Sequence, residues 1–148
     1  MQLEKQIDCL VNEILLKTEN QHELLFGTCQ SGVELTNTQE HILMLLSQER
    51  LTNSALAKRL NISQAAVTKA IKCLEKEGML APVKNKDDAR VTYFELTELA
   101  KPVADEHTHH HHATLSVYKK MIDNFSDEEQ SVISRFLTTF SDELEGCK

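Results

Sequence analysis

The stretch "TNSALAKRLNISQAAVTKAIKCLEKEG", residues 52–78, constrains the fold more than any other part of the chain. Apolar residues recur at three- and four-residue steps on both sides of "NIS", which indicates two amphipathic helices joined by a three-residue turn. Thr52 and Ser63 stand where side chains cap the first turns of helices, and Gly78 stands where the second helix would end. The stretch therefore predicts a helix-turn-helix.

Two β-type runs follow, "LAPV" at residues 80–83 and "VTYFEL" at residues 91–96, with the polar "KNKDDAR" between them. This order predicts a hairpin with a charged tip. A basic hairpin directly after a helix-turn-helix is typical of a winged helix-turn-helix, which would span residues 36–96. Because the chain has only 4 Gly and 2 Pro, the rest is expected to be helical. The predicted fold class is mainly α with a small β-hairpin wing.

Helices are also predicted on both sides of this unit. The first 25 residues carry apolar side chains at helical spacing, and Thr36 with Gln39 has the spacing of a capping box before "HILMLLSQ". A long helix is expected from Thr97 to about residue 123. Ser126 with Glu129 is a second capping box, which predicts the start of a last helix.

One face of the winged unit is expected to bind DNA. Residues 51–90 hold eight basic and four acidic side chains, a net +4, which leaves −11 for the rest of a chain whose net charge is −7. A basic region in an acidic chain is an electrostatic footprint for nucleic acid, although an ordinary helical hairpin with a solvated basic face is the alternative. The candidates for bases and phosphates in the major groove are Ser63, Gln64, Thr68 and Lys69, and those in the hairpin, for phosphates or the minor groove, are Lys84, Lys86 and Arg90.

Other classes of function find little support in the sequence. "HELLF" lacks the second histidine of the H-E-x-x-H zinc-protease motif, and the glycines permit neither a G-x-S-x-G elbow nor a phosphate loop, so no enzyme is expected. The longest aliphatic run, residues 42–46, is too short to cross a bilayer, and no secretory signal is visible. The 4 cysteines form no C-x-x-C pair, which argues against a zinc finger. We expect a cytoplasmic protein with no membrane contact and no organic cofactor.

The segment "DEHTHHHH", residues 105–112, holds five of the 7 histidines. An expression tag would be terminal and uninterrupted, whereas this run is internal and broken by Thr108. On a helix, residues four apart share a face and can grip one metal ion together, at about 100° per residue. This geometry predicts one pair on one face, a neighbouring pair, and two solvated histidines on the far face: His107 with His111, Glu106 with His110, and His109 with His112.

Two histidines from one helix leave a four-coordinate zinc site incomplete. Further imidazole, carboxylate and thiolate candidates lie earlier in the chain: Glu23, the weaker candidate His22, Cys29, Glu40 and His41. Such a mixed set suits Zn²⁺ better than Mg²⁺ or Ca²⁺, although Ni²⁺, Co²⁺ and Cu²⁺ also accept it. A solvated histidine run with no role in metal binding is the alternative.

Residues 51–100 resemble the core of a MarR-family regulator, including a D-x-R signature at Asp88–Arg90. The resemblance covers essentially the whole chain, since residues 1–35 and 97–148 match that family's dimerisation region. It implies a homodimer that places one recognition helix in each of two successive major grooves of a pseudo-palindromic operator in double-stranded DNA. A terminal amphipathic helix that cannot bury its apolar face in its own small domain favours a dimer independently. The low aromatic content argues against a small phenolic effector.

Within that family, "TQEHILMLL" together with "EHTHHHH" is similar to the zinc-sensing branch, the AdcR/ZitR-type repressors of zinc uptake. This resemblance implies a repressor with Zn(II), one or two ions per subunit, as corepressor. The implied ligands are Glu23, His41, His107 and His111 in the main site, and Cys29, Glu40 and Glu106 in a second site, to which the helical geometry adds His110.

Two other functions stay open at this point. The first is a MarR-type regulator that is released from DNA by an organic ligand or by oxidation of Cys29. The second is a metal-storage protein, which would need neither the recognition residues Ser63–Lys69 nor the wing.

Overall fold

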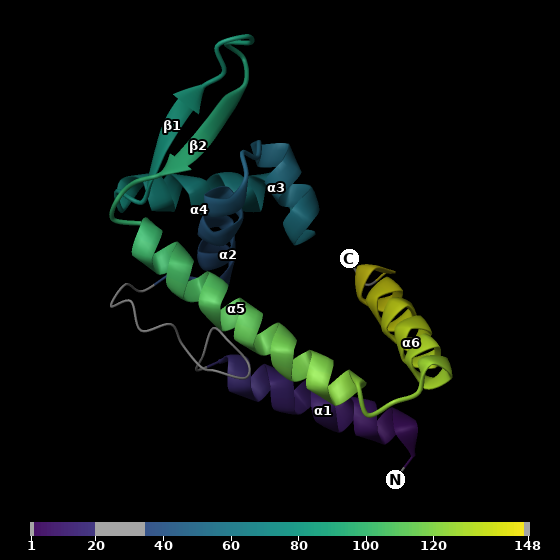
Figure 1. Cartoon of the computed structure of the whole chain (residues 1–148). Coiled ribbons are helices and arrows are strands. Elements are labelled where there is room, and N and C mark those ends of the chain that lie inside the picture. Colours follow the sequence, from purple (N-terminus) through teal and green to yellow (C-terminus); the bar gives the residue numbers. More distant parts are fainter. Residues whose placement is uncertain (1, 20–34, 147–148) are drawn as a thin grey trace. The chain divides into compact units, whose positions relative to one another are not determined.

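The computed structural model describes residues 2–19 and 35–146 (Figure 1). The elements are α1 (Leu3–Thr18), α2 (Asn37–Gln48), α3 (Asn53–Leu60), α4 (Gln64–Lys76), β1 (Leu80–Lys84), β2 (Thr92–Leu96), α5 (Lys101–Ile122) and α6 (Asp127–Gly146). The prediction of a mainly helical chain with one β-hairpin is confirmed. Within the described part of the chain, no helix combines the length and the apolar character that crossing a bilayer requires.

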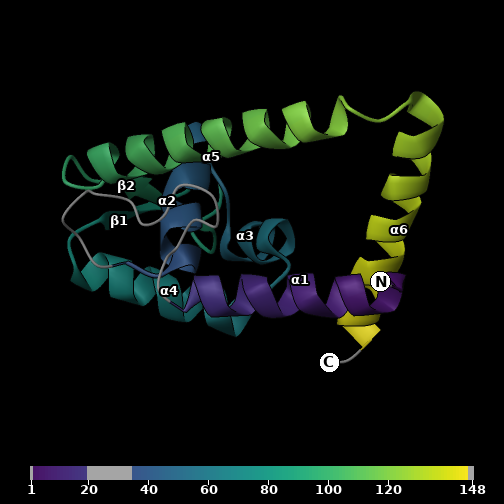
Figure 2. The same cartoon turned by 90° about the horizontal axis from the view of Figure 1, so that it is seen from below.

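The hydrophobic core lies where α2, α3 and α4 meet the base of the hairpin and the first turns of α5. Figures 1 and 2 show α2 between α4 and α5. Each helix contributes the apolar stripe that its sequence periodicity predicts, and burial of these stripes is the main stabilising contribution to the unit. The fully buried apolar side chains include Ile42, Leu43, Leu56, Val67, Leu74 and Ala104.

The helix-turn-helix is closed by local hydrogen bonds at its predicted ends. The Thr52 hydroxyl accepts a hydrogen bond from the Ala55 amide at 3.2 Å, and the Ser63 hydroxyl accepts one from the Ala66 amide at 3.1 Å. Both caps satisfy amides that the first turn of a helix leaves without partners. Gly78 follows α4 with φ +74°, a conformation that favours glycine, so the predicted helix stop is confirmed.

The hairpin is a regular antiparallel pair, in register from Leu80 opposite Leu96 to Lys84 opposite Thr92. Leu80 is buried, and Phe94 and Leu96 pack against the core, so the base of the hairpin is anchored. The tip beyond Lys84 carries no core residue. The hairpin therefore projects from the helical core as the predicted wing.

The long fifth helix begins later than the sequence predicts, at Lys101 rather than at Thr97. The Thr97 hydroxyl donates to the Gly78 carbonyl at 2.6 Å, and the Thr97 carbonyl accepts from the Ala100 amide at 3.1 Å. These bonds hold residues 97–100 in a turn between the wing and α5. Pro102 consequently lies in the first turn of α5, where its missing N–H costs least.

Both predicted capping boxes are confirmed. The Thr36 and Gln39 pair closes the start of α2, with heavy-atom distances of 2.9 and 3.2 Å. The Ser126 and Glu129 pair closes the start of α6, at 2.8 and 3.2 Å. These reciprocal bonds satisfy two backbone amides at each helix start.

The chain divides into two units, residues 1–111 and 112–148, and the boundary falls within α5. No described residue of α1 or α6 is buried. Both helices nevertheless carry large apolar side chains, including Leu10, Leu16, Phe136 and Leu144. The assignment of residues 1–35 and 97–148 to dimerisation stays a prediction, and residues 20–25 of the expected first helix lie outside the described residues.

Candidate functional site

The predicted DNA-reading residues gather at the start of α4. Ser63, Gln64 and Lys69 are exposed there, as recognition of base edges in a groove requires. Thr68 is half-buried, and its hydroxyl accepts a hydrogen bond from the Asn53 amide group at 2.6 Å. This bond ties the recognition helix α4 to α3, which fixes the angle at which α4 is presented.

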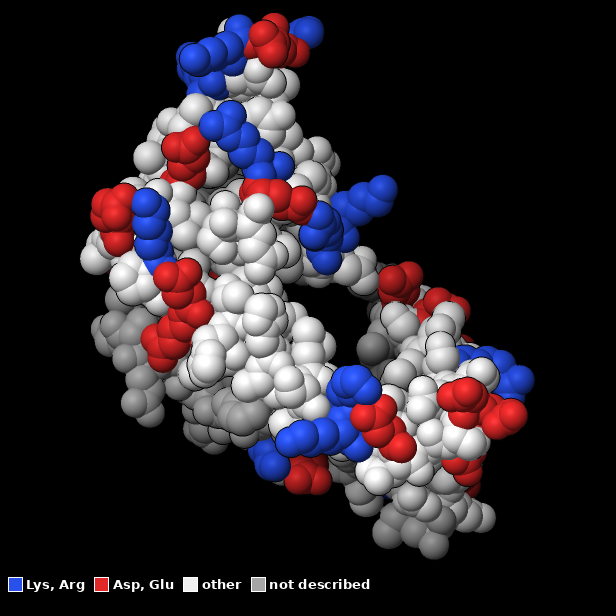
Figure 3. Space-filling model, viewed as in Figure 1, with Lys and Arg blue, Asp and Glu red and all other residues white. Residues whose placement is uncertain are grey.

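The wing supplies the predicted cationic groups. Lys84, Lys86 and Arg90 are all exposed, and Figure 3 shows Lys and Arg gathered where Figure 1 draws the tip of the hairpin. Arg90 contacts the Asp88 carboxylate with its Nε at 3.1 Å, and the Arg90 amide donates to the same carboxylate at 3.0 Å. These bonds lower the pKa of Asp88 below its ordinary value. The D-x-R motif therefore acts first as an internal brace of the tip.

A hollow connects the two candidate DNA-binding elements. It lies between α3, α4 and the wing, and its walls include Ser54, Gln64, Arg90 and Thr92. Hydroxyl, amide and guanidinium groups line the same space, and these are the groups that contact phosphates and base edges. The recognition helix and the wing are thus placed to contact one duplex together.

Three of the predicted metal ligands come together from two helices. The ring of His41 in α2 lies with its centroid 4.5 Å from that of His107 and 6.3 Å from that of His111, both in α5. Two imidazoles on one tetrahedral Zn²⁺ would have centroids about 5 Å apart, given Zn–N bonds of about 2.0–2.1 Å. The observed spacings lie on either side of that value. The imidazole donors are therefore of the kind that zinc prefers, but their spacing is not that of a formed tetrahedral site.

The second nitrogen of two of these rings already has a partner. His41 Nδ1 lies 2.9 Å from the Asn37 carbonyl oxygen, which orients Nε2 as the nitrogen for a metal. His107 Nδ1 lies 3.3 Å from a carboxylate oxygen of Glu40. His107 and Glu40 are 0% and 1% exposed, so this contact is inside the protein. Metal-binding histidines commonly have such a carbonyl or carboxylate behind them.

The remaining predicted ligands are less well placed. Glu106 and His110 are half-buried on α5, and the His110 ring lies 6.2 Å from that of His109. Glu23, Cys29 and the weaker candidate His22 lie outside the described residues. Within residues 2–19 and 35–146, no group of three or more His, Cys, Asp or Glu side chains is arranged to hold a metal ion. Exposure of His109 and His112 confirms that both face solvent.

Sequence reasoning missed two residues of these sites. Asn53 holds Thr68 across the helix-turn-helix, but nothing in a separation of 15 residues signals that contact. Glu40 was expected only in the second metal site, whereas its carboxylate lies against His107, a residue predicted for the main site. An acidic residue immediately before His41, at the start of an apolar run, is the sequence signal that could have suggested this role.

Comparisons with known proteins identify the family of this chain. The family model described as "MarR family" matches residues 35–92. The chain is 69% identical over 144 residues to the transcriptional regulator AdcR of Streptococcus pyogenes serotype M6, covering 97% of this chain and 98% of that protein. It is also 49% identical over 144 residues to the transcriptional regulator ZitR of Lactococcus lactis, covering 97% and 99%.

Two solved structures extend the likeness to the whole chain. The crystal structure of the zinc-dependent MarR-family regulator AdcR in its Zn(II)-bound state has a TM-score of 0.72 at 59% identity, and it covers 97% of this chain and 99% of the other. Lactococcus lactis ZitR in complex with DNA has a TM-score of 0.82 at 48% identity, with the same coverage. The chain therefore belongs to the MarR family of transcriptional regulators.

Proposed function

We propose that this protein is a zinc-responsive transcriptional repressor, which binds operator DNA of zinc-uptake genes as a homodimer when Zn(II) is bound. The observation that carries the proposal is the convergence of His41 with His107 and His111 beside the DNA-reading unit. The relatives named as zinc-dependent and as DNA-bound favour this function over release by an organic ligand or by cysteine oxidation.

The proposed main site consists of Glu23, His41, His107 and His111, with Glu23 supplied from outside the described residues. The proposed second site consists of Cys29, Glu40, Glu106 and His110, so that each subunit holds one or two zinc ions. The contact of Glu40 with His107 supports a link between the two proposed sites, because Glu40 is a proposed ligand of one and His107 of the other. Bound zinc would supply a bridge between imidazoles of different helices.

The residues around the site explain how such a bridge affects DNA binding. His41 lies in α2, which packs against both the recognition helix α4 and strand β2 of the wing. His107 and His111 lie in α5, which continues beyond this unit. Joining α2 to α5 restrains the recognition helices, and in a dimer it restrains their separation. Metal binding and DNA binding are then positively and reciprocally coupled.

The exposed apolar faces of α1 and α6 support the homodimer, since a second copy would bury them. Ser63, Gln64, Thr68 and Lys69 are the proposed contacts in the major groove. Lys84, Lys86 and Arg90 are the proposed contacts of the wing, and the protein acts in the cytoplasm on chromosomal DNA.

The test is a titration of the gene's own upstream DNA, as a fluorescent duplex, with the full-length protein. Zn²⁺ should raise the affinity over that in chelator by at least about tenfold, within the usual range of coupling between two sites. His41→Ala and His107→Ala should lose this stimulation, and His112→Ala should keep it because His112 is exposed on the far face. Circular dichroism melting checks that the variants are folded. Zinc-stimulated binding by both the His41 and His107 variants would refute the sensing site, and release by oxidant would support the alternative.

A further inference from the structure

The wing has two faces, and only one of them is held by the core. Phe94 and Leu96 pack inward against the core. Tyr93 and Glu95 alternate with them along β2, so their side chains lie on the opposite face. What holds that second face decides how firmly the hairpin is oriented.

Arg50 contacts the second face. Arg50 lies in the connection between α2 and α3, and its Nη2 lies 2.9 Å from a carboxylate oxygen of Glu95. The guanidinium carbon of Arg50 also lies 5.9 Å from the centroid of the Tyr93 ring, within cation–π range. One side chain therefore makes two contacts to alternate residues of β2. We call Arg50, Tyr93 and Glu95 the Arg50 clasp.

The position of the clasp means that a small rotation there would displace the tip of the hairpin. Glu95 stands opposite Ala81 and Tyr93 opposite Val83, so the clasp holds the half of the hairpin nearest the core. The cationic side chains of the tip lie four to six residues beyond the base pair of Leu80 and Leu96, about 13–20 Å at the rise of a strand. A rotation of about 10° at the base would move them by about 2–3.5 Å, which is comparable to a hydrogen-bond distance. Small changes at the clasp would therefore misplace the phosphate-binding groups.

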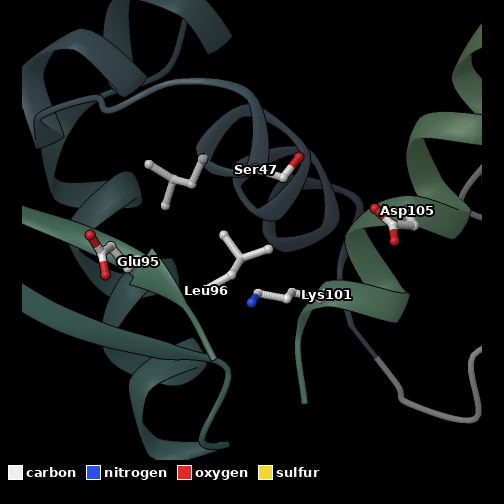
Figure 4. A pocket seen from close by; sticks show the side chains of 6 residues that line it. Ser47, Glu95, Leu96, Lys101 and Asp105 are labelled. Atoms are coloured by element: carbon white, nitrogen blue, oxygen red, sulfur yellow. The ribbon is translucent and has the colours of Figure 1, made fainter. Parts of the chain in front are cut away.

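Glu95 also stands at the junction with α5. Ser47 of α2, Glu95 and Leu96 of β2, and Lys101 and Asp105 of α5 line one cleft (Figure 4). The Lys101 amine pairs with Glu98 at 2.6 Å, and the negative charges of Glu98 and, more weakly, Glu95 raise the pKa of Lys101. Glu95 thus lies between the arginine of the α2–α3 connection and the helix that carries the histidine tract.

We propose that the Arg50 clasp sets the orientation of the wing, so that Arg50 and Glu95 are positioning residues for DNA binding. The proposal rests on the proposed DNA-binding function, because orientation of the wing matters only if the wing meets a duplex. Under this proposal, Arg50 acts through its contacts with Tyr93 and Glu95 and does not itself bind DNA. The competing role for an exposed arginine here is a direct contact with a DNA phosphate.

Glu95→Gln separates the two roles by the sign of its effect. The variant removes a negative charge, which by electrostatics alone should strengthen binding to DNA. It should also release Arg50, and a phosphate-binding Arg50 would then bind DNA better. If Arg50 instead orients the wing, Glu95→Gln weakens binding. The expected loss is about twofold to fivefold per wing, the range that exposed ion pairs support.

The measurement is fluorescence anisotropy with zinc-loaded, full-length protein and a duplex of the gene's own upstream DNA, at two salt concentrations. Glu98→Gln is the matched control, because it makes the same charge change three residues away, outside the wing. It should bind at least as tightly as wild type, because loss of the negative charge alone favours DNA binding. The salt slope of Glu95→Gln should equal that of wild type, since no phosphate contact is lost. Melting curves confirm that each variant is folded.

The swapped pair Arg50→Glu/Glu95→Arg provides the rescue. It should recover most of the affinity that Arg50→Glu alone loses, because the ion pair is restored in the reverse sense. Binding by Glu95→Gln that equals or exceeds wild type, or a swap no better than Arg50→Glu, would overturn the clasp while leaving the proposed function intact. Failure of the zinc-loaded wild type to bind the duplex would refute the proposed function, and the clasp with it.

Discussion

Helices α2, α3 and α4 differ from helices α1 and α6 in whether the chain buries their apolar faces. All are amphipathic in sequence, but only the first three bury their apolar residues within the chain. Ile42 is 0% exposed, whereas Phe136 is 46% exposed. Equal periodicity therefore leads to different outcomes, because burial depends on which surfaces meet. The winged helix-turn-helix in the middle of the chain buries its own apolar residues. The described residues of the terminal helices leave theirs exposed, where a second copy of the chain could cover them.

The largest expected effect tests the terminal helices. Phe136→Asp should prevent dimerisation, because the charge would have to be buried at the proposed interface. Operator affinity should then fall by about 100-fold or more, the gain that two linked binding units provide. Light scattering gives the mass, and anisotropy gives the affinity. Thr138→Asp adds the same charge at an exposed polar position of α6 and should remain dimeric. A dimeric Phe136→Asp protein would show that α6 faces solvent in the assembly.

The next effect tests the reading unit. Ile42→Ala should lower the free energy of unfolding by about 2–5 kcal/mol, since it leaves a cavity among fully buried side chains. Leu99→Ala removes a similar side chain that is 58% exposed, and should change that free energy by no more than about 0.5 kcal/mol. Urea denaturation followed by circular dichroism measures both. Equal losses would mean that burial in the single chain does not distinguish these positions.

The smallest effect compares the same substitution in both regions. Thr68→Val removes the acceptor of the Asn53 hydrogen bond that joins α3 to α4, and should cost about 1–2 kcal/mol of unfolding free energy. In α6 the Thr138 hydroxyl donates a hydrogen bond to the Ser134 carbonyl of its own helix, so Thr138→Val should cost less than about 0.5 kcal/mol. The same denaturation experiment measures both variants. Equal losses of unfolding free energy in the two variants would contradict the prediction that the bond between α3 and α4 contributes more than the bond within α6.

Local pattern was sufficient for much of the fold. The caps at Thr52 and Ser63, the stop at Gly78 and the two capping boxes depend on residues within four positions, so sequence spacing predicts them directly. The predicted start of α5 was wrong, because a hydrogen bond from Thr97 to Gly78, 19 residues away, holds a turn where the pattern indicated helix. Local rules cannot include such a contact.

The candidate site divides in the same way. Helical spacing determines that His107 and His111 share a face, and that His109 and His112 point to solvent, because a helix has a fixed angle per residue. Only the tertiary structure brings the ring centroids of His41 and His107 to 4.5 Å, places the Glu40 carboxylate beside the His107 ring, and brings Arg50 into contact with Glu95 of the wing. Those contacts join residues 45 to 67 positions apart, and packing of the helices on a shared core determines them. The sequence by itself thus determined which elements carry the candidate metal-binding and DNA-binding residues, and tertiary packing decided which of these residues meet.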